Sequence, residues 1–225
     1  SMKKNVIYSN INNLNFFDKV LLKKRDEILN IINKEILRDN ILDILDIGTT
    51  SDEKKIFSNF IIKNIKKAKI IKSISNQKIT SNFFKEKLKK SITRKFTKKE
   101  IHKFSSDLVL SNATIEHVGS RKKQRKMIEN VINLTKKKFI IVTPNKLHPI
   151  EFHTLLPLIH LLPRIFYSLI LKFIGMKFYA NEKNLNLLSK NDLINLLNKK
   201  KISFKIKYVR FLFFKSNLIL IGKKN

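Results

Sequence analysis

The sequence predicts an α/β protein in which a mostly parallel β-sheet is flanked by helices. Two segments carry this prediction. An apolar run at residues 41–47 ends in Asp46-Ile47-Gly48, and a second run at residues 107–112 leads into polar side chains. Each has the pattern of a buried strand that breaks into a turn, which is where open α/β sheets bind ligands. In addition, strand and helix patterns alternate with short connections, as in sheets built by right-handed crossovers.

The N-terminal elements follow from apolar spacing. Residues 13–38 carry apolar side chains at helical intervals, and we expect a helical lead-in over residues 1–40. The first strand, residues 41–47, is followed by a helix over residues 52–65, whose acidic first turn suits the helix dipole. Residues 69–75 are expected to form the second strand.

The middle of the chain has the weakest pattern. A helix is expected near residues 82–89 and a short strand at residues 92–96. The pattern returns with the strand at residues 107–112, which is followed by a helix over residues 122–134 and a strand at residues 138–143.

The C-terminal part is expected to complete the sheet. A helix over residues 190–198 precedes two strands, at residues 203–213 and 217–222, that form a closing hairpin. All strands then belong to one domain at residues 41–225, which contains an insertion at about residues 146–188.

The insertion contains an apolar stretch from Leu155 to Tyr179. Prolines, Arg164 and Lys172 interrupt this stretch, so no uninterrupted run is long enough to span a bilayer. Three arrangements are open. The insertion packs on the sheet, or it roofs the site and selects an apolar acceptor, or it enters a membrane interface with its lysines on lipid phosphates.

Composition narrows the partners and the chemistry. The 225 residues include 48 Lys and Arg against 17 Asp and Glu, a formal charge of +31 that would attract nucleic acid or an anionic bilayer. The lysine runs are spread along the chain, which favours a solvated surface instead. The absence of cysteine excludes disulfides, thiolate nucleophiles and Cys-type zinc sites. Because no apolar signal segment is recognisable, we expect a cytoplasmic protein that can associate with the inner face of the membrane.

Glycines are too few for two common nucleotide sites. The chain has only Gly48, Gly119, Gly175 and Gly222. A dinucleotide fingerprint needs three closely spaced glycines, and a P-loop needs two before a lysine, so both are excluded. Gly48 remains at the first strand-to-helix turn, where a glycine lets the backbone approach a ligand closely.

The two strand-to-turn segments resemble motif I and the motif after strand 4 of class I S-adenosylmethionine-dependent methyltransferases, in particular the type 11 group. The resemblance implies a Rossmann-like, mostly parallel seven-stranded sheet with an antiparallel last strand. It also implies S-adenosylmethionine as the cofactor and S-adenosylhomocysteine as the product. The residues implied to surround the methionine half of the cofactor are Asp46, Gly48, Thr49, Thr50 and Asp52.

Two further groups of cofactor contacts are implied by their positions after the strands. Family members usually have an acid at the end of strand 2 for the ribose hydroxyls. This chain has Asn76 and Gln77 there, whose amides both donate and accept hydrogen bonds. Ser111, Asn112 and Ala113 follow strand 4, where the resemblance implies that the methyl group and its acceptor meet.

His117 is the candidate general base, because imidazole titrates near neutrality. A structural hydrogen-bonding role is the alternative. Polar residues nearby would either line an acceptor pocket or stabilise a loop: Glu116, Asn145, His148, Glu151 and His153. A metal site formed by Glu151, His153 and His160 would lack the spacing of known zinc motifs, so no metal is expected.

The resemblance therefore implies transfer of a methyl group to an oxygen or nitrogen of a small or lipid-linked acceptor. The alternative is a non-catalytic basic protein on a degenerate methyltransferase scaffold that binds RNA or an anionic membrane. The missing strand-2 acid and the positive charge favour that alternative. No RNA-binding module is recognisable, so we expect no specific nucleic-acid partner.

Overall fold

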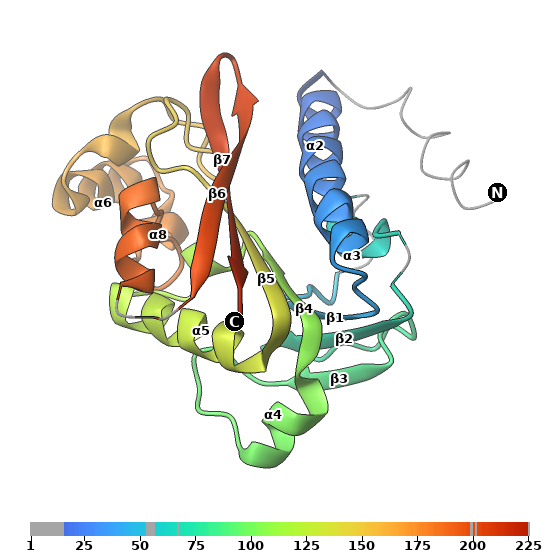
Figure 1. Cartoon of the computed structure of the whole chain (residues 1–225). Helices are drawn as coiled ribbons and strands as arrows, with labels where there is room; N and C mark the ends of the chain where they lie inside the picture. The colour runs from blue at the N-terminus through green and yellow to red at the C-terminus, as the bar shows by residue number, and fades with distance from the viewer. Residues whose placement is uncertain (1–15, 53–56, 67, 199, 201, 225) are drawn as a thin grey trace.

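A seven-stranded sheet forms the centre of the molecule (Figure 1). The computed structural model describes residues 16–52, 57–66, 68–198, 200 and 202–224. In spatial order the strands are β3 (Glu86–Lys89), β2 (Ile70–Ser75), β1 (Asp43–Ile47), β4 (Ser106–Asn112), β5 (Thr135–Pro144), β7 (Phe214–Lys223) and β6 (Ser203–Phe211).

Strands β1 to β5 are parallel to one another, whereas β7 runs antiparallel to both β5 and β6. This arrangement confirms the expected mostly parallel sheet with an antiparallel last strand. Residues Ile44, Leu45 and Ile47 of β1 are fully buried, because helices cover both faces of the sheet.

Helices α2 (Phe16–Arg38) and α3 (Phe60–Lys63) cover one face of the sheet. The other face is covered by α5 (Arg121–Leu134) and α8 (Lys190–Leu197), and α4 (Lys98–Phe104) contributes Phe104 to the same core. Helix α2 confirms the helical pattern of the predicted lead-in over residues 16–38, while residues 1–15 of that lead-in lie outside the described residues.

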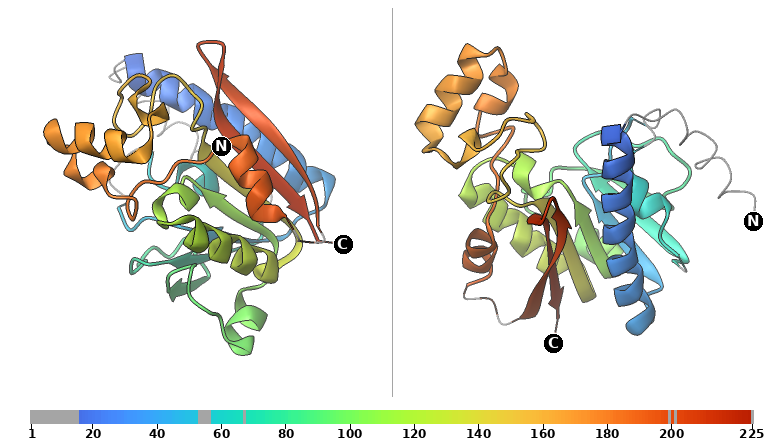
Figure 2. Two further views of the ribbon diagram at one scale, coloured as in Figure 1. Left: turned by 90° about the vertical axis from the view of Figure 1, so that its left-hand side faces the viewer. Right: turned by 90° about the horizontal axis from the view of Figure 1, so that it is seen from above.

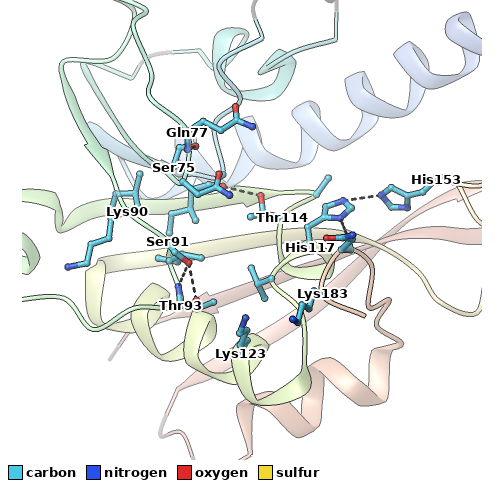
Figure 3. Close-up of a pocket in the computed structure, with 18 of the residues that line it drawn as sticks. Ser75, Gln77, Lys90, Ser91, Thr93, Thr114, His117, Lys123, His153 and Lys183 are labelled. Atoms are coloured by element: carbon cyan, nitrogen blue, oxygen red, sulfur yellow. Dashed lines mark hydrogen bonds between the residues drawn. The ribbon is translucent and has the colours of Figure 1, made fainter. Parts of the chain in front are cut away.

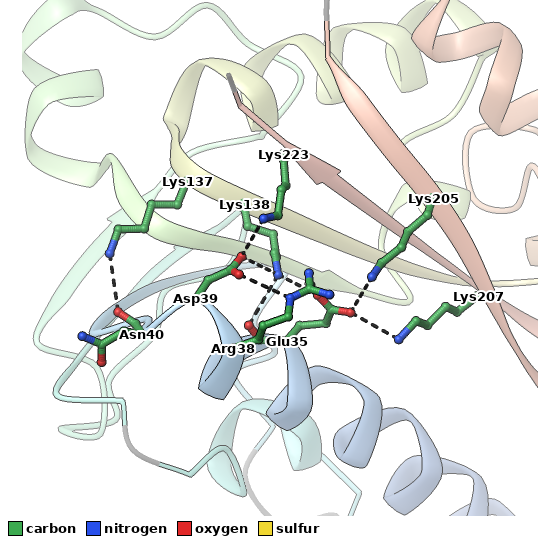
Figure 4. A network of polar contacts seen from close by, with 9 residues as sticks. All are labelled: Glu35, Arg38, Asp39, Asn40, Lys137, Lys138, Lys205, Lys207 and Lys223. Carbon is green, nitrogen blue, oxygen red and sulfur yellow. Dashed lines mark hydrogen bonds and ion pairs between the residues drawn. The ribbon is translucent and has the colours of Figure 1, made fainter.

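An ion cluster around Glu35 attaches α2 to the sheet (Figure 4). The Glu35 carboxylate lies 2.6 Å from Lys138 Nζ of β5, 2.8 Å from Lys205 Nζ and 3.2 Å from Lys207 Nζ, both of β6. Lys138 also contacts Asp39 at 2.6 Å. Glu35 and Lys138 are buried, so water screens their interaction poorly.

The insertion between β5 and α8 contains a 3-10 turn (Ile159–Leu161), α6 (Arg164–Phe173) and α7 (Lys177–Ala180). Tyr167, Leu171 and Ala180 form a small core that is separate from the two cores of the sheet. Figure 2 shows α6 at the outer end of the insertion, away from the sheet. None of the helices in the described ranges is long and apolar enough to cross a membrane.

Two predictions between β2 and β4 were wrong. Residues 86–89 form strand β3, not the end of a helix, and residues 92–96 contain turns instead of a strand. Strand β3 is a short edge strand in which charged residues surround Leu88, so it carries little apolar pattern. Helix α4 was missed, although Thr97 and Glu100 form a capping box that is recognisable in sequence.

The helix predicted over residues 52–65 is much shorter in its described part, where only Phe60–Lys63 is helical. Asn59 takes a left-handed φ of 56°, and its side-chain amide donates to the Thr50 carbonyl oxygen at 2.9 Å, which favours a turn before the helix. Residues 53–56 lie outside the described residues. The other predicted strands and helices are confirmed with small shifts of their boundaries.

Candidate functional site

The candidate site lies at the carboxyl ends of β1 and β4, where the strand order reverses direction. Gly48 follows β1 with φ +91°, and Ala113 follows β4 with φ +50°. Two cavities, of about 630 and 420 Å³, meet here, and Ile47, Gly48 and Ala113 line both of them. A ligand bound across this point would contact both strand ends.

The smaller cavity contains one acidic and one basic side chain. Asp46 of β1 is only 6% exposed, and burial raises the pKa of its carboxyl group to about 6, although a hydrogen bond from Thr49 opposes the shift. Arg25 reaches this cavity from α2, and its buried Nη1 has no hydrogen-bond partner within the described ranges. The cavity therefore offers complementary contacts to an ammonium group and to a carboxylate.

Thr49 holds the turn after β1 in place. Its hydroxyl donates to Asp46 Oδ2 at 2.6 Å and accepts from the Ser73 hydroxyl at 2.7 Å. Ser75 Oγ donates to the Thr49 carbonyl oxygen at 2.6 Å. Thr49 is therefore buried beneath the turn, and its contacts orient the Asp46 carboxylate.

Residues 50–52 continue this turn. Thr50 lines the smaller cavity, and its amide donates to Asn59 Oδ1 at 3.0 Å. The Asp52 amide donates to the Thr50 hydroxyl at 3.2 Å.

The larger cavity extends from the end of β2 to the insertion (Figure 3). Asn76 and Gln77 line it, as do residues 91–93. Gln77 Oε1 accepts from the Ser51 amide and hydroxyl at 2.8 and 2.9 Å, which holds the side chain against the turn after β1. Lys123 and Lys183 make part of the wall basic.

Two histidines meet at the wall of the larger cavity. His117 follows β4 and His153 belongs to the loop after β5, and their Nε2 atoms lie 3.2 Å apart. His117 Nδ1 is 2.6 Å from the carbonyl oxygen of Asn184, and His153 Nδ1 is 2.6 Å from Glu151 Oε1. Burial lowers the pKa of His153, but the Glu151 hydrogen bond and the Glu116 charge outweigh burial and raise it.

Glu116 lies behind the histidine pair and is fully buried. Its Oε2 accepts from the Thr143 hydroxyl at 2.9 Å. Its Oε1 has no hydrogen-bond partner in the described structure and lies 4.0 Å from His117 Nε2. Glu116 therefore lies next to the histidine pair on its buried side and does not line either cavity described above.

The other predicted acceptor residues have structural contacts. Asn145 Nδ2 donates to the Lys215 carbonyl oxygen at 2.8 Å, and its Oδ1 accepts from the Leu147 amide at 3.1 Å. His148 is buried, and its ring stacks on Phe211. Both residues thus connect the start of the insertion to the β6–β7 hairpin and do not line the two cavities.

Glu151, His153 and His160, which were considered above as a metal site, do not all contact one another. Glu151 contacts His153, but His160 Nε2 bonds to the His148 carbonyl oxygen at 2.9 Å instead.

Among the residues predicted to contact the cofactor after β4, Asn112 lines the smaller cavity. The Ser111 hydroxyl is buried without a partner in the described ranges and lines neither cavity.

No known family model matches the chain, and no curated protein sequence matches it. Solved structures do match. Magnesium protoporphyrin IX methyltransferase (ChlM) from Synechocystis PCC 6803, with bound SAH, aligns with a TM-score of 0.55 at 13% identity, over 94% of this chain and 89% of that chain. The methyltransferase domain of bacterial CtHen1 has a TM-score of 0.55 at 10% identity, over 89% of this chain and 100% of that chain. This chain has the class I methyltransferase fold.

A third match supports the same fold. An O-methyltransferase family protein from Burkholderia thailandensis aligns with a TM-score of 0.55 at 9% identity, over 92% of this chain and 58% of that chain. Identities this low establish the methyltransferase fold alone, and the type 11 assignment stays a prediction.

Several residues that line this methyltransferase-fold site were not predicted from the sequence, among them Arg25 and Thr114. Arg25 lies three residues after Leu22 and three before Ile28, on the buried stripe of α2, so a basic residue on an apolar face was the available signal. Thr114 packs against the α-carbon of Gly48, and its hydroxyl lies 3.2 Å from the Ile47 carbonyl oxygen. Gly48 is therefore required by its own neighbour Thr114 as well as by its positive φ.

Proposed function

We propose that this protein is an S-adenosylmethionine-dependent methyltransferase that transfers a methyl group to an oxygen or nitrogen of its acceptor. One observation carries the proposal: Asp46 and Arg25 border one cavity at the point where the sheet reverses direction, and Arg25 Nη1 has no hydrogen-bond partner among the described residues. An amino-acid tail has an ammonium group and a carboxylate, and these two side chains complement it.

The remaining cofactor contacts suit a nucleoside in the larger cavity. Asn76 and Gln77 offer amides to the ribose hydroxyls in place of the acid found in related enzymes. Ile92 and Thr93 border the same cavity and would contact the base. Gly48 and Ala113 line both cavities, so a cofactor that crosses them would bring its sulfur close to the histidine pair.

The cofactor, when bound, supplies a methyl group that is already activated, so the protein mainly aligns donor and acceptor and excludes water. The acceptor atom attacks the methyl carbon, and the electron pair of the broken carbon–sulfur bond stays on sulfur. The acceptor proton would leave at the pair formed by His117 and His153, which borders the larger cavity.

Calorimetric titration with S-adenosylhomocysteine tests this proposal. The wild-type protein should bind one equivalent, and Arg25→Met should bind at least about tenfold more weakly, because a charge-assisted hydrogen bond is lost. Arg125→Met, which changes an exposed arginine on α5, serves as the matched control and should bind like the wild type. No binding by the folded wild-type protein at millimolar ligand would refute the assignment.

The exposed face of α6 supports a lipid-linked acceptor at an anionic membrane. Four large apolar side chains share this face: Ile165, Phe166, Leu169 and Phe173. Lys172 and Lys177 lie beside them, and the chain has a formal net charge of +31. This positive charge complements anionic headgroups. The same insertion contributes Phe178 and Tyr179 to the wall of the larger cavity, so it connects the apolar face to the site.

Sedimentation with lipid vesicles tests the membrane contact. Wild-type protein should sediment with phosphatidylcholine vesicles that contain phosphatidylglycerol, and binding should weaken with salt. The double variant Ile165→Ser/Phe173→Ser should lose binding, whereas Phe83→Ser, an exposed site before β3, should not. Equal binding by all three proteins would contradict a role of α6.

The non-catalytic alternative remains the second candidate function, because the positive charge favours it. It predicts binding to a generic RNA duplex that falls steeply with salt, together with no binding of S-adenosylhomocysteine.

A further inference from the structure

The histidine pair has a proton arrangement that requires a cation. His117 Nδ1 lies 2.6 Å from a main-chain carbonyl oxygen, which cannot donate, so this Nδ1 must carry the hydrogen. His153 Nδ1 lies 2.6 Å from the Glu151 carboxylate and donates to it in the same way. In the neutral rings, both Nε2 atoms therefore present lone pairs, and these face each other at 3.2 Å. Two such lone pairs repel unless a proton or a metal ion lies between them.

The surroundings of Glu116 indicate whether the cation between the two Nε2 atoms is a proton or a metal ion. Its Oε1 is fully buried, has no hydrogen-bond partner in the described part of the chain, and lies 4.0 Å from His117 Nε2. A proton shared between the two Nε2 atoms would leave Oε1 without a partner, which is costly for a buried carboxylate oxygen. A metal ion could bind all three atoms, which lie within 4.8 Å of one another, once Glu116 Oε1 moves closer to His117 Nε2 than its present 4.0 Å.

We infer that Glu116, His117 and His153 bind one divalent first-row transition-metal ion, for which Zn²⁺ is the reference. Two imidazole nitrogens on a tetrahedral Zn²⁺, each at 2.0–2.1 Å, would be roughly 3.3 Å apart. The observed separation is 3.2 Å. Imidazole ligands favour Zn²⁺ and similar ions over Mg²⁺ or Ca²⁺, which prefer oxygen.

The surroundings have the features of a prepared metal site. Each ring donates its Nδ1 hydrogen to an oxygen, the Asn184 carbonyl for His117 and the Glu151 carboxylate for His153, and such contacts fix the tautomer of metal-binding histidines. Thr143 fixes the other oxygen of Glu116 through a 2.9 Å hydrogen bond. Three protein ligands leave a coordination position open, and both histidines border the larger cavity.

The open position gives the metal a role in methyl transfer, and this part of the inference rests on the proposed function. An acceptor hydroxyl at that position would have a lowered pKa and would release its proton to water before attacking the methyl carbon. With its Nε2 bound to a metal, His117 could not act as the general base, so the metal would promote the deprotonation in its place and the proton would go to water, not to the histidine pair. The acceptor class is then an alcohol or phenol.

Equilibrium dialysis of chelator-treated protein against Zn²⁺ tests the site. Wild-type protein should retain one equivalent, and His153→Ala should bind at least about 100-fold more weakly. Glu116→Gln keeps the shape of the side chain and should also weaken binding. His102→Ala removes an exposed histidine on α4 and is the matched control, so it should bind like the wild type. Circular dichroism confirms that each variant is folded.

The outcomes separate the metal from the methyltransferase proposal. If folded His153→Ala binds Zn²⁺ as tightly as the wild type, or if the wild type binds none, the pair shares a proton and the metal site is refuted. Titration of metal-free protein with S-adenosylhomocysteine is an independent test of the cofactor site. Binding of S-adenosylhomocysteine without Zn²⁺ binding would overturn only the metal, and the reverse result would overturn only the methyltransferase function.

Discussion

Glu35→Gln removes the negative charge at the centre of the ion cluster that joins α2 to β5 and β6 (Figure 4). Burial raises the pKa of Glu35, but hydrogen bonds from Lys138, Lys205 and Lys207 outweigh burial and lower it from 4.5 to about 2. A tenfold change in an ionisation equilibrium corresponds to about 1.4 kcal/mol, so the cluster favours the ionised carboxylate by about 3 kcal/mol. Breaking a buried ion pair by removing one partner has a similar cost.

For a protein of this size, a loss of about 3 kcal/mol should lower Tm by roughly 6–12 °C. Thermal unfolding followed by circular dichroism at pH 7 measures the change. Glu86→Gln is the matched control, because it removes an exposed ion pair with Lys103 and should leave Tm nearly unchanged.

The pH dependence provides a second measurement of the same effect. The folded-state pKa of Glu35 lies below its unfolded value, so its contribution is present above about pH 4.5 and disappears as the pH falls towards 2. The difference in unfolding free energy between wild type and Glu35→Gln should therefore shrink over this interval. A difference below 1 kcal/mol at pH 7, or one that does not change with pH, would contradict this account of the cluster.

Three further predictions concern single residues. Because burial raises the pKa of Asp46 to about 6 and an ammonium group requires its ionised form, S-adenosylhomocysteine should bind about tenfold more weakly at pH 5 than at pH 7.5. Asp46→Asn should abolish that dependence, and calorimetry at both pH values measures it. Gly48→Ala should lower the free energy of unfolding by more than about 2 kcal/mol in urea, since it combines a positive φ with a clash against Thr114, and a neutral result would contradict this packing. Gly222→Ala should cost about 1–3 kcal/mol by the same assay, because its new Cβ would meet the ring of the buried Phe139. Replacing Phe139 by Leu in that variant should recover part of the loss.

Much of the sheet could be predicted because its strands are covered on both faces. β1 and β4 each have a fully buried apolar centre, at residues 44–45 and 108–110, and this local pattern requires no knowledge of their neighbours. β3 could not be recognised in this way, since an edge strand needs few apolar residues and this one alternates Leu88 with charges. The sequence also left the position of α6 open, because an apolar stretch indicates contact with apolar surroundings but does not indicate whether these are the sheet, a ligand or a membrane.

For the site, the sequence by itself determined which residues follow the strand ends, because a parallel sheet places its strand ends at one edge whatever the side chains do. Asp46, Gly48 and His117 were recognised on this basis. Only the tertiary structure decided that Arg25 borders the cavity of Asp46 and that His153 meets His117. The physical reason is that these partners come from a preceding helix and a later loop, and their meeting depends on how those segments pack against the sheet, which no local pattern records.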